Sequence, residues 1–165
     1  GGAKSSSYAQ YIKPPYGSME MPVAPGSGSA ANNLTNPGGG AIIVQADRAM
    51  MFNGRAIVQG NADNRDWYAA SAAGSVYLMA RRFTSATGEI GAQGGRSEKG
   101  HSFGAGGGGH VAIWAGTFDI LDANGTTNIA VNVSGGTQLG SQIPAEAGTI
   151  YWGRFPPVGT SIFIR

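Results

Sequence analysis

Pro37-Gly38-Gly39-Gly40-Ala41-Ile42-Ile43-Val44-Gln45-Ala46 is the stretch that indicates the fold, because a glycine run leads directly into a short apolar segment. Three later segments repeat this order, with a small residue followed by alternating apolar positions. Alternation with a period of two is typical of a β-strand that buries one face. The four segments start 34, 35 and 39 residues apart, at Gly40, Gly74, Gly109 and Gly148.

A second series of strand-like segments is interleaved with the first. Each member starts with glycine, and the starts are 34, 37 and 34 residues apart. The members span residues 54–60, 88–94, 125–133 and 159–165. One phenylalanine lies between the two segments of every pair: Phe52, Phe83, Phe118 and Phe155. Two series with nearly the same period indicate an internal repeat of about four units.

The repeat predicts an all-β solenoid. Two short strands cannot bury a core alone, whereas stacking like segments on like segments gives parallel sheets and a continuous core. We expect glycines with positive φ at tight corners, and the phenylalanines stacked at one corner. The first-series strands should form one sheet that contains Ile43, Val76, Val111 and Ile150. A register slip of one residue would exchange the buried face. A Greek-key sandwich is the competing all-β prediction, but sandwiches rarely repeat one strand pair four times.

The composition is that of a folded chain with few charges. Glycine makes up 29 of 165 residues, yet 41% are hydrophobic and only 12% are charged, which is unlike a disordered chain. The formal charge is +2 and no basic run is longer than Arg81-Arg82, so we expect no nucleic-acid partner. No stretch approaches the ~20 apolar residues that span a bilayer, so no membrane insertion is expected. The absence of cysteine excludes a disulfide scaffold and a thiolate metal site.

Several glycine-rich blocks resemble a known kind of protein. Residues 37–46 and 52–60 are similar to the glycine-rich right-handed parallel β-helix repeats of large bacterial surface and secreted proteins and of phage tail proteins. Residues 88–95 and 104–113 look like the next coil of this pattern, and the register becomes less clear after Phe118. The resemblance covers about residues 16–153. It implies a right-handed parallel β-helix of about four short coils and a structural or adhesive extracellular role, with no catalytic residues to transfer.

Residues 1–37 differ from the solenoid predicted over residues 38–165. They contain prolines and methionines but no repeat unit, and proline favours extended backbone. We expect an extended arm, which packs along its own solenoid or over one end, docks on a neighbouring subunit, or is disordered. Aromatic side chains suit contact surfaces. The candidate assembly contacts in the arm are Tyr8, Tyr11 and Tyr16.

The last residues also bear on assembly. A strand pattern runs to the final residue in Ser161-Ile162-Phe163-Ile164-Arg165, with one charge at the tip. The end of a solenoid exposes unpaired N–H and C=O groups, so a second copy can add there head to tail and form a filament. This makes Ile162, Phe163 and Ile164 candidate assembly contacts. The alternative is that the chain is a fragment whose missing C-terminal part supplies a cap.

One loop concentrates polar and aromatic side chains between two predicted strands: Asp63, Arg65, Asp66, Trp67 and Tyr68. The plainest interpretation is a solvated loop tip. The alternative is a glycan-binding patch, in which the aromatic rings stack on sugar faces and the charged groups bind hydroxyls. An enzyme site is least favoured, because Asp63 and Asp66 are too close in sequence to be placed on opposite walls of a catalytic groove.

Two further motifs are better explained by structure than by chemistry. Residues 104–109 fit G-x-G-x-x-G, but a dinucleotide site needs these glycines to open a helix, and here a predicted strand follows. The only histidines are His101 and His110, and the chain contains neither H-E-x-x-H nor G-x-S-x-G. We therefore expect no cofactor, no metal and no catalytic site.

Two classes of function remain. The first is a non-enzymatic structural protein, a self-assembling subunit or module of an extracellular filament or surface fibre, whose partner is a second copy of itself. The second is a phage tail or cell-surface adhesin module that binds glycans. A polysaccharide-acting enzyme is a distant third, since parallel β-helices also carry such activities. We expect the protein to be extracellular, at the cell surface or on a virion tail.

Overall fold

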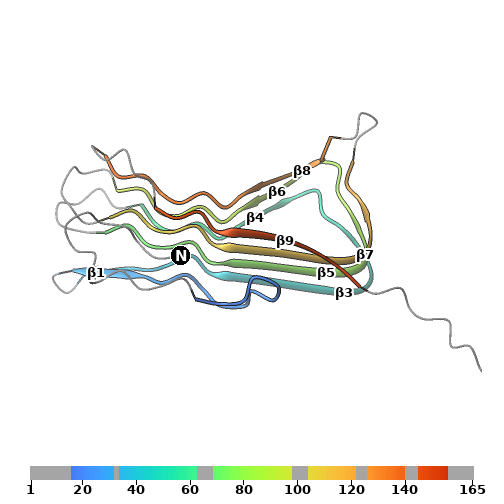
Figure 1. The fold of residues 1–165 in the computed structure, drawn as a ribbon, viewed down its shortest axis with the longest axis horizontal. Coiled ribbons are helices and arrows are strands. Elements are labelled where there is room, and N and C mark those ends of the chain that lie inside the picture. The colour runs from blue at the N-terminus through green and yellow to red at the C-terminus, as the bar shows by residue number, and fades with distance from the viewer. Residues whose placement is uncertain are drawn as a thin grey trace, which may run out of the picture.

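The computed structural model describes residues 16–31, 34–62, 69–97, 104–121, 126–139 and 145–155. In these residues the secondary structure consists of nine β-strands, without a helix. Seven strands form two parallel sheets, and the other two, β1 (Ser29–Ala31) and β2 (Leu34–Asn36), pair antiparallel. The described chain is therefore all-β and dominated by parallel sheets (Figure 1).

Each sheet takes one strand from successive repeats. The larger sheet has the order β3-β5-β7-β9, formed by β3 (Ala41–Met51), β5 (Ser75–Thr84), β7 (His110–Asp119) and β9 (Thr149–Arg154). The smaller sheet has the order β4-β6-β8, formed by β4 (Arg55–Ile57), β6 (Gly88–Gly91) and β8 (Ile129–Asn132).

Every pair in these two sheets is parallel. The prediction of parallel sheets is thus confirmed. The Greek-key alternative is wrong for these segments, because that topology pairs its strands antiparallel. The predicted strand over residues 159–165 lies outside the described residues.

The register of the larger sheet corrects one expectation. Ile43 pairs with Tyr77 and is 50% exposed, whereas its neighbour Ile42 pairs with Val76. Side chains alternate across a strand, so this shift of one residue puts position 42, and not position 43, on the buried face. The ladder on that face runs through Ile42, Val76, Val111 and Ile150.

The apolar core lies between the two sheets. The larger sheet contributes Leu78 and Ile113, which are neighbours in the β5–β7 ladder and are fully buried. The smaller sheet contributes Ala56, Ile90 and Ile129 from its three strands. The alternation of apolar positions seen in the sequence therefore separates side chains that face this core from side chains on the outer faces of the sheets.

The phenylalanines of the first three repeats meet at the corner between the sheets. The ring centroids of Phe52 and Phe83 are 6.3 Å apart, and those of Phe83 and Phe118 are 6.2 Å apart. The fourth phenylalanine does not continue this stack. Phe155 instead stacks on Trp114 at 5.9 Å, and Trp152 packs edge-on against Phe118 at 5.5 Å. The predicted aromatic stack therefore holds for three repeats.

Extended segments that are not β-strands continue both sheets on one side of the molecule (Figure 1). Residues 37–40, 69–74, 104–109 and 145–148 lead into the larger sheet, and we call them the entry row. Residues 58–62, 92–97 and 133–139 leave the smaller sheet, and we call them the return row. Both rows are rich in glycine.

The entry segment 69–74 shows how these rows are bonded. The N–H groups of Ala70 and Ala73 donate to the next entry segment, at Gly104 and Gly107. Those of Ser71 and Gly74 donate to the return row, at Asn61 and Val58, and that of Ala72 donates to Ser27 of the N-terminal arm. Successive N–H groups thus point in turn to the next entry segment, the return row and the arm, with a period of three residues. This period belongs to a polyproline II-like extended chain and not to a β-strand, which has a period of two.

The glycines serve close backbone packing, and this corrects their predicted role at corners. A positive φ occurs only at Gly17 and Gly104 among the described glycines. A β-carbon on Gly60 or Gly106 would instead overlap the carbonyl oxygen of Ser71, and one on Gly95 would overlap that of Asn61. Two extended rows can pack backbone against backbone only where side chains are absent, as in other three-fold extended bundles.

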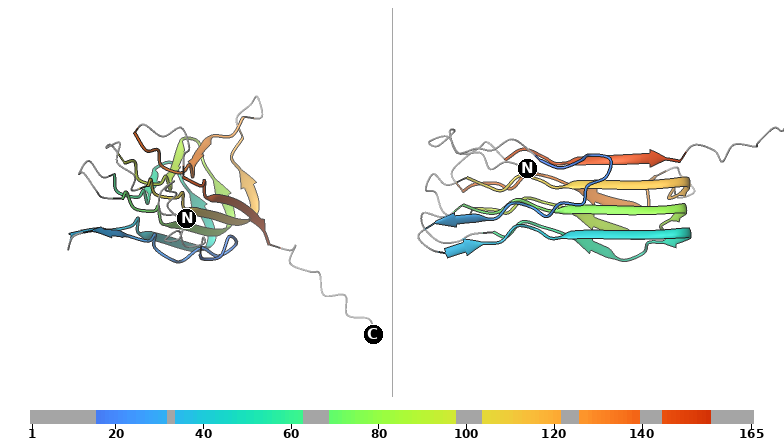
Figure 2. Two further views of the ribbon diagram at one scale, coloured as in Figure 1. Left: turned by 60° about the vertical axis from the view of Figure 1, so that its left-hand side comes forward. Right: turned by 90° about the horizontal axis from the view of Figure 1, so that it is seen from below.

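The described part of the arm packs on the chain's own sheet. The indole Nε1 of Trp114 donates to the carbonyl of Glu20 at 2.7 Å, and the Ser75 hydroxyl donates to the carbonyl of Ala24 at 2.5 Å. Gly26 N–H donates to the carbonyl of Gly39, which adds this part of the arm to the entry row. The arm therefore crosses the outer face of the larger sheet (Figure 2).

Candidate functional site

Among the described residues, the outer strands of the larger sheet, β3 and β9, are each paired on one side only. On the buried-face ladder, Val44 of β3 is 43% exposed, and Ile150 and Trp152 of β9 are 40% and 39% exposed. The side chains at the same positions of the two middle strands are at most 1% exposed: Val76, Leu78, Val111 and Ile113. Core-type side chains therefore continue to both ends of the described sheet.

The free edge of β3 is regular over only part of its length. The register with β5 shifts between Ala46 and Ala49, where the exposed residues Asp47 and Arg48 stand opposite Arg81 alone. A bulge with charged side chains protects an edge strand against further pairing. The regular part, residues 41–46, matches the six residues of β9 in length.

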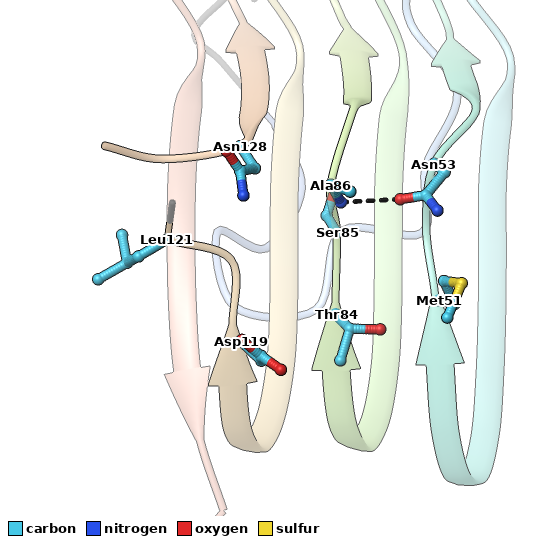
Figure 3. Close-up of a pocket in the computed structure, with 8 residues that line it drawn as sticks. All are labelled: Met51, Asn53, Thr84, Ser85, Ala86, Asp119, Leu121 and Asn128. Carbon is cyan, nitrogen blue, oxygen red and sulfur yellow. Dashed lines mark hydrogen bonds between the residues drawn. The ribbon is translucent and has the colours of Figure 1, made fainter. Parts of the chain in front are cut away.

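A pocket of about 250 Å³ lies where the chain turns from the larger to the smaller sheet (Figure 3). Three successive repeats supply its polar groups. Asn53 comes from the first repeat, Thr84 and Ser85 from the second, and Asp119 and Asn128 from the third. The strand ends bring these residues together because each repeat makes the same turn at the same place.

The corner pocket combines hydrogen-bonding groups with two apolar walls. Asn53 Oδ1 accepts a hydrogen bond from Ala86 N–H at 2.8 Å, which orients its amide (Figure 3). Asp119 Oδ2 accepts from Arg82 at 3.1 Å in an exposed ion pair. Met51 and Leu121 flank these groups. Amide, hydroxyl and carboxylate groups beside apolar side chains suit a polyhydroxylated ligand better than a fatty one.

His110 joins three parts of the structure. Its Nε2 lies 3.2 Å from the carbonyl oxygen of Tyr16 in the arm, and its Nδ1 lies 2.7 Å from Thr149 Oγ1 in β9. A carbonyl only accepts, so the neutral ring carries its proton on Nε2 and accepts from the threonine hydroxyl. Burial lowers the pKa of the His110 imidazole below its ordinary value. The ring is therefore a neutral structural link.

Most residues proposed from sequence lie outside the described part of the chain. This holds for the glycan patch Asp63, Arg65, Asp66, Trp67 and Tyr68, and for the assembly candidates Tyr8, Tyr11, Ile162, Phe163 and Ile164. The exception is Tyr16, whose hydroxyl donates to the carbonyl of Pro25 at 2.6 Å. Its contacts are made within the chain, while its ring remains half-exposed.

Sequence reasoning missed both the corner pocket and the link at His110. Apart from the neighbours Thr84 and Ser85, the polar pocket residues are far apart in sequence, and only the repeat period brings positions 53, 85 and 119 to one corner. The repeat period could therefore have been used to predict that these residues lie at one corner. The contact of His110 with residue 16 spans 94 positions, and no local pattern marks it.

The described residues contain no group of three or more His, Cys, Asp or Glu side chains placed to hold a metal ion. None of their elements is a helix of the length and apolarity that crossing a membrane requires.

Comparison of the chain with family models, curated proteins and solved structures gives no match.

Proposed function

We propose that this chain is a non-enzymatic structural module, a self-assembling part of an extracellular filament or surface fibre, built as a right-handed parallel β-solenoid of about four coils. A solenoid is an open stack, so its end coils can be extended by a further copy. The parallel order of both sheets, with one strand per repeat, supports this architecture.

The observation that carries the proposal is the exposure of the buried-face ladder at both ends of the larger sheet. Val44 and Trp152 occupy the same ladder position as the buried Leu78 and Ile113, yet each is more than one-third exposed. Covering such side chains is worth about 25 cal/mol per Å² of apolar surface. When copies stack, the apolar side chains at the two ends of the sheet cover each other, as the apolar side chains of the middle strands already do.

The corner pocket supports a non-catalytic role. Asp119 is the one carboxylate among its described lining residues, and it is paired with Arg82. Glycoside hydrolysis uses two carboxyl groups facing each other across the scissile bond. We therefore expect no turnover of pectin, alginate or similar polymers. A measured lyase or hydrolase activity that is abolished in Asp63→Ala/Asp66→Ala would overturn this expectation.

Light scattering over a range of protein concentrations, with negative-stain microscopy of the same samples, tests the proposed function. The expected result is a mass that rises with concentration and linear particles in the images. Ile162→Lys/Ile164→Lys should reduce the mass if the C-terminal segment takes part. A protein that stays monomeric at the highest concentration contradicts self-assembly.

A glycan-binding adhesin module is the second candidate, and the corner pocket is the observation that favours it. Binding of oligosaccharides on a glycan array, followed by calorimetry, tests this function. Asn53→Ala should weaken binding at the pocket, whereas Trp67→Ala should weaken it if the loop at residues 63–68 is the site. Binding that neither variant changes would place the glycan elsewhere, and no binding on the array would remove this candidate.

A further inference from the structure

A ladder of glycines runs across the larger sheet at its junction with the entry row. A β-carbon on Gly74 would overlap the carbonyl oxygen of Gly40, one on Gly109 would overlap that of Gly74, and one on Gly148 would overlap that of Gly109. Each repeat therefore needs glycine at this position because the carbonyl of the preceding repeat lies against it. The need for glycine therefore comes from the neighbouring repeat and not from the backbone conformation of the glycine's own repeat.

Gly40 is the first member of this ladder, and no described residue is such a neighbour for it. A β-carbon built on Gly40 meets nothing within 4 Å among the described atoms, and its φ lies outside the left-handed region. As far as the described residues of one copy are concerned, alanine would fit there. A glycine at position 40 is explained if a further carbonyl lies against it, as one does at Gly74.

We propose that β9 of a second copy pairs in parallel with the β3 edge, with Gly148 of that copy placed against Gly40. This inference rests on the proposed self-assembly and names its interface. It extends the register of the sheet, so that residues 149–154 of the second copy pair with residues 41–46. Ile150 of the second copy then meets Ile42, and Trp152 of that copy meets Val44.

The hydrogen bonds of the sheet set the direction of this contact. Ser75 N–H donates to Gly40 O, His110 N–H donates to Gly74 O, and Thr149 N–H donates to Gly109 O, each at 3.1 Å. The next bond in this series runs from Ala41 N–H to Gly148 O of the second copy. One end supplies donors and the other supplies acceptors at this position, so the two ends are complementary.

Three other observations agree with a second copy as the occupant. The regular edge of β3 and the whole of β9 have the same length, and the bulge at Asp47 and Arg48 stops pairing where β9 ends. The described arm bonds to β5 and β7 and leaves Val44 exposed on the β3 edge. Both edges also carry apolar side chains on the same face of the sheet.

Two substitutions test the interface on the full chain by light scattering and analytical ultracentrifugation. Gly40→Ala should weaken association at least about tenfold, because its methyl group would meet the incoming carbonyl. Val44→Lys should weaken it similarly, because the ammonium group would be buried without a partner. Met51→Lys is the matched control, since Met51 is 77% exposed and lies beyond the bulge, and it should associate like the wild type.

Thermal unfolding at low protein concentration shows whether the single copy is intact. Gly40→Ala should unfold at the wild-type temperature there, whereas Gly74→Ala should unfold far below it. If Gly40→Ala is destabilised as strongly as Gly74→Ala, position 40 is already occupied within one copy and the inference is wrong. If both interface variants associate like the wild type, the register is wrong but self-assembly stands. If the wild type never associates, the proposed function itself fails.

A disulfide test reports the register directly, because the chain has no cysteine of its own. Ile43 and Tyr151 should face each other across the interface, at a Cα separation that a disulfide can bridge. Mixing Ile43→Cys with Tyr151→Cys under mild oxidation should give a dimer in which mass spectrometry finds the 43–151 link. Mixing Met51→Cys with Tyr151→Cys is the out-of-register control. Equal yields from the two mixtures would overturn the proposed pairing.

Discussion

The backbone N–H of Gly95 donates to the carbonyl oxygen of Ser71 at 2.9 Å, and this bond joins the return row to the entry row of the same repeat. The carbonyl of Gly95 accepts in turn from Gly106 N–H, that of Gly106 from Gly136 N–H, and that of Gly136 from Ala145 N–H. This series of bonds crosses between the two rows from the second repeat to the fourth. The glycine-rich half of the molecule is thus held mainly by backbone contacts, whereas the sheet half also has a core of apolar side chains.

Gly106→Ala should strongly destabilise the fold, because its β-carbon would overlap the Ser71 carbonyl oxygen in this series. Overlap with backbone cannot be relieved by a rotamer change, so we expect a loss of about 3 kcal/mol or more in the free energy of unfolding. Gly54→Ala is the control, since its β-carbon meets nothing within 4 Å. Urea denaturation measures both variants, and equal losses would contradict the close backbone packing in the glycine-rich half of the molecule.

Phe83→Ala should cost ~4 kcal/mol of stability, because this ring is fully buried between Phe52 and Phe118. Phe52→Ala should cost clearly less, since Phe52 is only half-buried at the end of the stack. Chemical denaturation of the two variants gives the comparison. A larger loss at position 52 than at position 83 would contradict the order of the aromatic stack.

Stability should fall as the pH drops below about 6.5, the ordinary pKa of histidine. The folded pKa of His110 is lowered, so the unfolded chain binds a proton first and acid favours unfolding. His110→Gln should flatten the dependence of stability on pH in this window. Thermal unfolding at several pH values checks this, and an unchanged slope in His110→Gln would show that other groups cause it.

Trp114→Phe should loosen the arm, because phenylalanine keeps a ring on the sheet but cannot donate to the Glu20 carbonyl. Losing one such hydrogen bond costs about 1 kcal/mol, so the arm should open roughly fivefold more often. A glutamate-specific protease that cuts after Glu20 reports this opening, with the cleaved fragment measured by mass spectrometry. Met51→Lys, which is far from the arm contacts, should be cut at the wild-type rate.

The strands and their parallel pairing could be predicted from the sequence because apolar alternation and spacing are local signals. Positions 42 and 43 are both isoleucine, and this made the register ambiguous by one residue until the partner strands decided it. The phenylalanine stack was predictable for three repeats. It ends at Phe118 because β9 stops at Arg154 and presents Trp152 to that ring.

The role of the glycines could not be predicted from composition. A glycine run is compatible with a turn, a linker or close backbone packing, and only the position of the neighbouring chains distinguishes these. Ser71 and Ala145 illustrate the difficulty, since they bond within the same series as the glycines without being glycine themselves. The corner pocket depends in the same way on three repeats meeting at one place.

The series of backbone bonds between the two rows also has a mechanical consequence. Because these bonds and the sheet bonds link successive repeats, a tension applied along the stack loads one repeat at a time, and the repeats should peel off in sequence. The 34 residues from Gly40 to Gly74 would release about 120 Å of extended chain at each such step. A tension applied along the strands loads every ladder together in shear. The stack of repeats would therefore be compliant along its own axis and stiff along the strands.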